Sequence, residues 1–494
     1  MKMNRLDDIV KINISIASPP VDSANFDNLL LIGPPPVGAT KALRAAGRYS
    51  DLQEVTDAGF AATGPDADPI GVAARIAFSQ TPRLPHIFVA PILGAPMMLS
   101  GGEAAIVEIE AAGKSAPALR MSYKRHGICS EDVEVEKDGA LVFGMSSFEE
   151  PDSEECFQIA LCAPDGPESS LGVDEAELAG EYTVTIAATD ADGNRTELCQ
   201  TVKYDGEGGQ ESAGCETKYV PSATALSEAL DAANGTAGWY VLCEAGIDQS
   251  LFAALAEWTE AKTRQFAYTF LQKEDPVAAI FFRSQGWCGL VNDCDRPGDV
   301  PEANRYLHVA AVARCLQIPA GGDNWAFKRL GAVHPAETSG TLRQKLTEGH
   351  SNFFTRHAGR SITMNGQVRG GEWIDTIRGR DWLENDMQLR IAGVLFMRDK
   401  LPFTNQGIAL IENQMIAGLK AAQNRGIVAP DEYGADGSLV PGFTASVPNA
   451  QSLSAAQRAS RRLYGCKFAA RIAGAVNFAR VDGTLTYEGG ADFG

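Results

Sequence analysis

One segment of the chain, residues 101–215, differs from the rest in charge and in pattern, and it decides how the remainder can be organised. It holds 25 of the 63 acidic residues but 7 of the 43 basic ones, so it carries most of the net charge of −20. Its apolar residues alternate with polar ones, and its turns KDGA and DADGN are typical of hairpins. We therefore predict an antiparallel β-sandwich that carries this negative charge into solvent.

The sequence on either side of this segment has the rhythm of an α/β domain. Apolar runs at 28–33 (NLLLIG), 86–92 (HIFVAPI) and 238–246 (GWYVLCEAG) predict buried parallel strands. Helical patterns, among them TKALRAAGRY and DPIGVAARIAFSQ, lie between them. Closing a surface loop over a folded module costs little, so one domain can interrupt another. We therefore predict an α/β domain from residues 26–100 and 216–330, with the acidic segment inserted.

Residues 331–470 are predicted to form a further C-terminal α/β domain, which makes the chain a multidomain α/β or α+β protein. Two long helical patterns run over 380–399 and 404–425. Thr404 stands where an N-cap is expected, and Gly426 stands where a glycine commonly ends a helix.

A further helix, predicted over 452–465, is basic in a chain that is acidic as a whole. It would place Arg458, Arg461 and Arg462 on one face at i, i+3 and i+4, and Lys467 follows closely. Such a pattern is usually a solvated helix face. In an acidic chain it also fits a surface that binds an acidic protein partner.

Both ends of the chain carry short alternating patterns that predict strand arms, at 1–25 and 471–494. Near the start, Ile12, Ile14 and Ile16 share one face of a strand, and two prolines follow it. A strand so separated from the body suits an arm that pairs with another chain. A first strand folded back onto its own domain fits this pattern nearly as well.

One stretch has the glycine spacing of a phosphate-binding loop, but its other residues do not fit. Gly33 and Gly38 are correctly spaced and Thr40 is in place, yet Ala39 stands where the lysine is expected. Three successive prolines also remove backbone N–H groups that would hold phosphate. A nucleotide-binding enzyme that uses the Gly33–Thr40 loop therefore remains a weak alternative.

No other pattern predicts catalysis, a metal or a cofactor. His350 and His357 are seven residues apart, which does not favour helical metal ligation. The acidic residues near Asp381 alternate with Arg378 and Arg380, so ion pairing within one domain is the better expectation.

Several function classes are disfavoured by composition. No run of 18 apolar residues is present, so no membrane insertion is expected, and the first residues lack the pattern of a signal peptide. The ten cysteines contain no CxxC pair, which predicts free thiols in a reducing compartment. The negative net charge disfavours nucleic acid as a partner. A secreted protein whose insertion binds a ligand, and which would contain disulfides, is a third class.

The stretch from NFFTRHAGRSITMNGQVRGGEWIDTIRGRDWLENDMQ to GIVAP, within residues 350–430, resembles the tail sheath subunits of contractile-tailed bacteriophages. The ending RASRR…FAARIAGAVNFARVDGTLT and the start NFDNLLLIG resemble theirs as well. The resemblance covers most of the chain except the acidic insertion. It implies a structural subunit, not an enzyme, that forms hexameric rings stacked helically around a tail tube and contracts to drive the tube through a target envelope.

The resemblance also implies roles for particular residues. The terminal strands would complete small sheets in neighbouring subunits, and their contact residues would be Ile12, Ile14, Ile16, Val476, Phe478, Val481, Leu485 and Tyr487. Tube attachment would fall to Arg458, Arg461, Arg462 and Lys467. The expected partners are copies of the chain, the tail tube protein, and baseplate and tail terminator proteins. The expected location is a virion tail assembled in the host cytoplasm, and the sheath of a related bacteriocin or injection apparatus fits the sequence as well.

Overall fold

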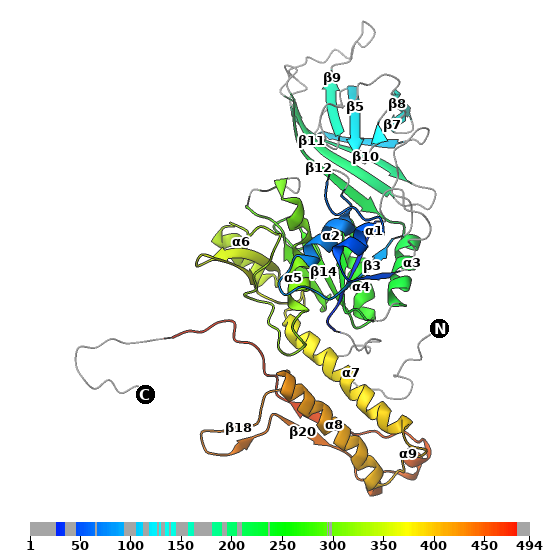
Figure 1. Ribbon diagram of the computed structural model, residues 1–494, viewed down its shortest axis with the longest axis vertical. Helices are drawn as coiled ribbons and strands as arrows, with labels where there is room; N and C mark the ends of the chain where they lie inside the picture. Colours follow the sequence, from blue (N-terminus) through cyan, green and yellow to red (C-terminus); the bar gives the residue numbers. More distant parts are fainter. Residues whose placement is uncertain are drawn as a thin grey trace, which may run out of the picture.

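The computed structural model describes residues 26–34, 46–64, 67–92, 221–235, 238–293, 295 and 299–481, and the backbone of strands between 105 and 220. Figure 1 shows three parts along the long axis: the strands of the insertion, a central α/β domain, and a pair of long helices with a small sheet. The predicted N-terminal arm, with Ile12, Ile14 and Ile16, lies outside the described residues.

An eight-stranded, mostly parallel sheet forms the centre of the α/β domain. In order across the sheet, its strands are β17 (Arg360–Met364), β16 (Asn352–His357), β15 (Ser284–Cys288), β14 (Gln265–Phe270), β13 (Val241–Glu244), β1 (Leu29–Gly33), β3 (Ile87–Pro91) and β2 (Gly47–Tyr49). Only the two outer strands, β17 and β2, are antiparallel to their neighbours. The predicted mixed α/β fold with buried parallel strands is confirmed.

Helices cover both faces of this sheet, because successive residues of a strand point to opposite sides. In β1, Leu29 and Leu31 pack in one apolar cluster, and Leu30 and Ile32 pack in the other; all four are fully buried. The first cluster includes residues of α2 and α5, and the second includes residues of α3, α4 and α6. The helices of this domain are α1 (Leu52–Asp57), α2 (Pro69–Phe78), α3 (Ala223–Asn234), α4 (Phe252–Ala261), α5 (Leu307–Cys315) and α6 (Gly340–Glu348).

The α/β domain differs from the sequence prediction in two places. The helix predicted over TKALRAAGRY is wrong at its end, because Gly47–Tyr49 forms β2 and pairs antiparallel with β3. The sheet also continues beyond residue 330, since β16 and β17 pair within it. Ala358 and Gly359 connect these two strands with φ of 47° and 76°, the positive values that a tight hairpin turn requires.

The insertion contains a six-stranded and a three-stranded sheet. Its strands are β4 (Ala105–Ala111), β5 (Ala118–Arg125), β6 (Ile128–Cys129), β7 (Glu134–Lys137), β8 (Ala140–Gly144), β9 (Phe157–Cys162), β10 (Gly180–Thr189), β11 (Arg195–Tyr204) and β12 (Gln210–Val220). The hairpins predicted at KDGA and DADGN are confirmed, because β7 pairs with β8 and β10 with β11. The sheet is not purely antiparallel, since β4 and β7 are parallel. The sandwich packing stays a prediction.

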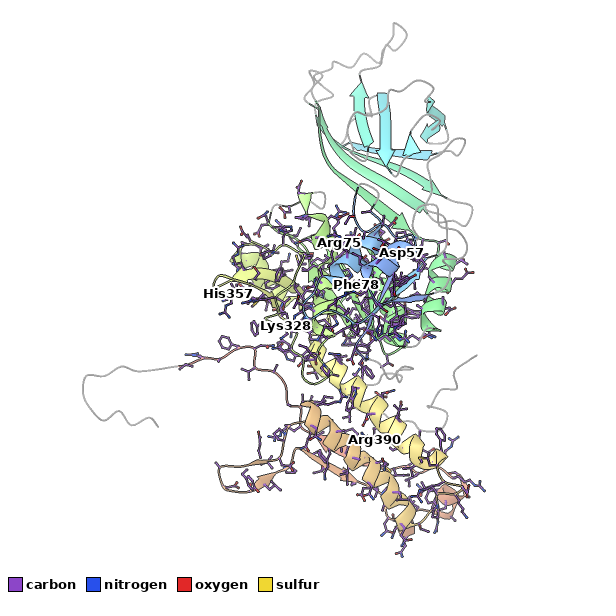
Figure 2. All side chains as sticks on the ribbon, viewed as in Figure 1. Asp57, Arg75, Phe78, Lys328, His357 and Arg390 are labelled. Atoms are coloured by element: carbon purple, nitrogen blue, oxygen red, sulfur yellow. The ribbon has the colours of Figure 1, made fainter. Side chains whose placement is uncertain are left out.

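A long helix, α7 (Ile374–Phe396), connects the α/β domain to a smaller C-terminal unit (Figure 1). Ile374 and Ile377 at its start belong to the core of the α/β domain. Its second half packs against α8 (Asn405–Arg425), and Figure 2 shows Arg390 on the part that has left the α/β domain. The predicted ends of α8 are confirmed: the Thr404 side chain accepts from the Gly407 N–H, and Gly426 is left-handed with φ 82°.

The helix predicted over 452–465 is much shorter than expected. The short elements of the C-terminal unit are β18 (Glu432–Tyr433), β19 (Leu439–Val440), β20 (Phe443–Ser446), α9 (Ala455–Ala459) and β21 (Lys467–Ala470). A capping box between Ser454 and Gln457 starts α9. The helix stops at Ala459 and Arg461 has a φ of 57°, so the shared face predicted for Arg458, Arg461 and Arg462 does not form.

A buried ionic cluster holds α7 to the sheet. Asp381 of α7 is fully buried and accepts a hydrogen bond from the Tyr240 hydroxyl at 2.6 Å. It also forms ion pairs with Arg283 and Arg380. The Nε of Arg283 in turn donates to the carbonyl oxygen of Arg264 at 3.0 Å. The ion pairing predicted near Asp381 is therefore present, and it joins α7 to the α/β domain.

A second buried polar group lies at the carboxyl end of β13. Burial raises the pKa of the Glu244 carboxyl to about 8. Beside it, burial lowers the pKa of the His308 imidazole to about 3. The two ring nitrogens of His308 lie 2.8 Å from the Thr269 hydroxyl and 2.9 Å from the Glu244 carbonyl oxygen, so both are hydrogen-bonded.

The raised pKa of Glu244 predicts a pH dependence of stability. Its pKa in the folded protein lies above the ordinary 4.5, so the folded state loses stability as pH rises from about 4.5 to about 8. Glu244→Gln removes this titration. We expect the free energy of unfolding of the variant minus that of wild type to be roughly 2–4 kcal/mol larger at pH 8.5 than at pH 4.5, because only wild type loses stability over this range. Denaturant titrations at the two pH values measure it, and an equal difference at both would contradict it.

Candidate functional site: a groove beside an open two-stranded sheet

β20 and β21 form a two-stranded sheet, and no third strand among the described residues pairs with it. The strands are antiparallel, with Phe443 opposite Ala470 and Ala445 opposite Phe468. These four residues are half-buried against the α7–α8 cluster, and the residues that alternate with them are exposed. A two-stranded sheet is marginally stable alone, and unpaired strand edges offer N–H and C=O groups to another strand.

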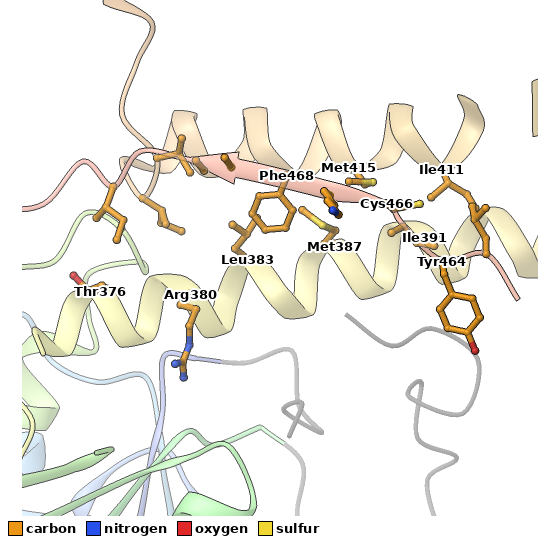
Figure 3. A pocket seen from close by; sticks show the side chains of 18 of the residues that line it. Thr376, Arg380, Leu383, Met387, Ile391, Ile411, Met415, Tyr464, Cys466 and Phe468 are labelled. Carbon is orange, nitrogen blue, oxygen red and sulfur yellow. The ribbon is translucent and has the colours of Figure 1, made fainter. Parts of the chain in front are cut away.

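An apolar groove lies along the same sheet, between α7, α8 and β21 (Figure 3). Its volume is about 1730 Å³. That exceeds the roughly 300–1,000 Å³ of small-molecule pockets, so the groove suits a segment of polypeptide better than a small ligand. The apolar side chains that line it include Leu383, Met387, Ile391, Ile411, Met415 and Phe468.

The structure brings three of the four predicted basic site residues to this groove. Arg461, Arg462 and Lys467 are exposed and line it. Arg458 is exposed on α9 and does not line it. The positive charge therefore gathers on a turn and a strand end, not on one helix face.

The described part of the predicted C-terminal arm runs on from β21. The Ala429 N–H donates to the Arg471 carbonyl oxygen at 2.7 Å, and Val428 and Ile472 form an antiparallel bridge. Beyond this point the predicted contact residues are strongly exposed: Val476 at 81%, Phe478 at 83% and Val481 at 90%. Leu485 and Tyr487 lie outside the described residues.

At the other end, the first described residues are held by Arg378 of α7, which is fully buried. Its Nε donates to the Phe26 carbonyl oxygen at 3.0 Å and its Nη2 to Asp27 at 2.6 Å. Its Nη1 donates to the Ile318 carbonyl oxygen at 2.7 Å and to Asp323 at 2.9 Å. Sequence reasoning missed this role, because the partners are far away in the sequence. One feature of the sequence could have indicated this role: Arg378 directly follows Ile377 near the apolar start of α7.

The described residues give no support to the other candidate sites. A Cβ on Gly33 would lie 2.2 Å from the carbonyl oxygen of Ala245, so close packing of the β1 end explains this glycine. Residues 35–45, with most of the suspected phosphate loop, lie outside the described residues. In the part of the chain that is described, no three His, Cys, Asp or Glu side chains gather as metal ligands, and no helix could cross a membrane. The described cysteines, Cys243, Cys288, Cys315 and Cys466, are free thiols.

The fold is similar to that of a solved contractile sheath. The helical sheath of the anti-feeding prophage (AFP) in its contracted state matches with a TM-score of 0.51 at 10% identity, over 97% of this chain and 98% of its own. The sheath tail protein Lin1278 from Listeria innocua matches with a TM-score of 0.43 at 10% identity, over 86% of this chain and 89% of its own. No curated protein is detectably similar in sequence.

The C-terminal part of the chain also matches a sequence family. Residues 374–485 match the family model described as E217 tail sheath protein gp31-like, C-terminal domain. This range holds α7, α8, the two-stranded sheet and most of the groove. The resemblance to tail sheath subunits predicted from the sequence is therefore confirmed over residues 374–485.

Proposed function

We propose that this protein is the structural subunit of a contractile tail sheath. It would polymerise helically, as stacked hexameric rings around an inner tail tube, and contract to drive the tube through the target cell envelope. The observation that carries this proposal is the open edge of the β20–β21 sheet beside an apolar groove, inside the range that matches the tail sheath family. Its partners would be copies of itself, the tube protein, and baseplate and terminator proteins, in a virion tail assembled in the host cytoplasm.

The occupant that best fits the groove is a terminal strand from another copy of the chain. An added strand would pair its backbone with the open edge and place every second side chain on the α7–α8 floor. In the N-terminal arm, Ile12, Ile14 and Ile16 supply three such side chains. Since one copy gives a strand and the next receives it, the contact is heterologous and can repeat without closing, which generates a helical assembly.

The same arrangement accounts for contraction without a nucleotide. Subunits that stay joined by exchanged strands can move from an extended lattice to a shorter, wider one of lower free energy. The extended state would be held by a kinetic barrier until the baseplate releases it.

The insertion supports an orientation of the subunit in the sheath. Its strands lie at the end of the molecule opposite α8 and β20 (Figure 1). If the C-terminal unit faces the tube, the acidic insertion faces outward. Repulsion between like charges would then discourage neighbouring tails from associating.

A substitution in the groove tests the proposal. Ile411 of α8 lines the groove and is half-buried, so Ile411→Asp puts a charge where the added strand would pack. We expect soluble, folded protein that forms no tubes by negative-stain microscopy, because burying an unpaired carboxylate is costly. Asn413→Asp is the matched control, since it adds the same charge at an exposed position of α8 that does not line the groove. Tubes formed equally by both variants would refute the docking role of the groove.

The basic side chains at the groove make a separate prediction. Reversing charge with Arg461→Glu and Arg462→Glu should abolish co-sedimentation with tail tubes. Arg329 and Arg360 are also exposed but do not line the groove, so their double replacement by glutamate is the control. The attraction should weaken with salt, because it acts between exposed charges. Unchanged tube binding by the Arg461/Arg462 variant would exclude this attachment role.

A second candidate is the sheath of a related bacteriocin or injection apparatus. The likeness to the anti-feeding prophage sheath favours it. Particles purified with this protein would distinguish the two functions, because a phage tail is attached to a DNA-filled head and the alternative particle is not.

A further inference from the structure

A tight turn, Gly321–Asn324, lies where several parts of the chain meet. Asp323 holds the turn together, because its carboxylate accepts from the Gly321 N–H at 3.1 Å and from the Trp325 Nε1 at 3.0 Å. Gly321 has a φ of 95°, and a Cβ there would lie 2.6 Å from the carbonyl oxygen of Arg425 at the end of α8. The turn is therefore closed by its own hydrogen bonds and packed directly on α8.

The turn is joined to the start of the described chain through one buried side chain. Asp323 is buried and forms an ion pair with Arg378 at 2.9 Å. Burial alone would lower the pKa of Arg378, but the carboxylates of Asp323 and Asp27 raise it, so the guanidinium stays charged. The same guanidinium binds Phe26 and Asp27, which directly follow the predicted N-terminal arm. A single side chain therefore connects the turn to the base of this arm.

The next residue of the turn contacts the other end of the chain. The Asn324 Nδ2 donates to the Asn477 Oδ1 at 2.9 Å. The Asn324 Oδ1 accepts from the Ala326 N–H at 3.0 Å, which fixes the orientation of the amide. Asn477 lies between Val476 and Phe478, so this contact falls where the C-terminal segment leaves the body.

We propose that the Gly321–Asn324 turn is a common anchor for both terminal arms, with Arg378 and Asn324 as positioning residues. Force on one arm reaches the other arm, α7 and α8 through two adjacent residues, Asp323 and Asn324. The inference rests on the proposed function, because it states how a subunit joined to neighbours by two arms passes load between them.

The first experiment measures coupling in the unassembled protein. Hydrogen exchange of the Ala326 N–H reports on the Asn324 amide. Asn477→Ala removes the acceptor for Asn324, and we expect exchange of this N–H to become about three- to tenfold faster. Asn477→Asp keeps an acceptor oxygen and should exchange as wild type. Asn424→Ala, at an exposed position of α8, is the control. Unchanged exchange in Asn477→Ala, or equal effects of alanine and aspartate, would overturn the anchor.

The second experiment measures coupling in the assembled protein, as the concentration at which half of it pellets as tubes. Asp27→Ala and Asn477→Ala should each raise this concentration by about three- to tenfold, and the double variant should add little to the larger single effect. If the fold-increases of the two single variants multiply in the double variant, the two arms are anchored independently. That result would overturn the common anchor. If wild type forms no tubes while the exchange result holds, the anchor stands and the proposed function fails.

Discussion

Replacing Arg378 by methionine should lower the free energy of unfolding by about 3–5 kcal/mol, because it leaves the Asp323 carboxylate buried without its cation. The carbonyl oxygens of Phe26 and Ile318 lose a donor in the same step. Methionine replaces the apolar stem of the arginine and carries no charge, so most of the loss would come from the polar groups left without a partner. We expect the start of α7 and residues 26–28 to become protease-sensitive first.

Arg390→Met is the matched control on the same helix. Arg390 pairs with Asp386 at 2.5 Å across one helical turn, but its side chain is 34% exposed. Exposed pairs of this kind contribute less than about 1 kcal/mol. Denaturant titrations of the two variants make the comparison. Equal losses would show that the Arg378 contacts do not hold α7 to the α/β domain.

Deleting either terminal arm, residues 1–20 or 475–494, should abolish polymerisation and leave soluble, folded monomers. Both deletions spare Phe26, Asp27 and β21, so the buried contacts of Arg378 and the β20–β21 pairing remain. What is lost is the strand that one copy gives to the next. Sedimentation velocity and negative-stain microscopy measure the outcome.

Substitutions that keep the length of the N-terminal arm test whether its sequence matters for polymerisation. Replacing Ile12, Ile14 and Ile16 by serine keeps the arm but removes the apolar face that would enter the groove. Replacing Lys11 and Asn13 by serine changes the opposite face and should be tolerated. Intact tubes after both deletions, or equal effects of the two serine variants, would refute strand exchange.

Local sequence signals predicted the elements that depend on local chemistry. Continuous apolar runs are enough to identify β1 and β13, since both are buried on two faces. Thr404 and Gly426 mark the ends of α8, because capping is a contact between near neighbours.

Elements whose stability comes from distant contacts were missed or misjudged. β15 reads SQGWC and lacks an apolar run, yet Ser284 and Gln285 are fully buried, and Gln285 bonds to Gln265 of the next strand. The prediction of a basic helix over 452–465 was wrong because the positive φ of Arg461 ends the helix. No periodicity in the sequence indicates such a change of backbone direction.

The candidate site could be predicted only in part for the same reason. The basic residues and the apolar alternation of the arms are readable in the sequence. The groove cannot be read from the sequence, because α7, α8 and β21 create it by packing together. The anchoring role of Arg378 cannot be read from it either, because its partner Phe26 is 352 residues away.

A cryo-electron microscopy map of the polymerised protein tests strand exchange between subunits most directly. We predict tubes of stacked six-fold rings in which a strand from a neighbouring copy pairs with the β20–β21 sheet and covers Ile411 and Phe468. Tubes in which this groove is empty, or protein that forms only monomers and closed oligomers, would contradict it.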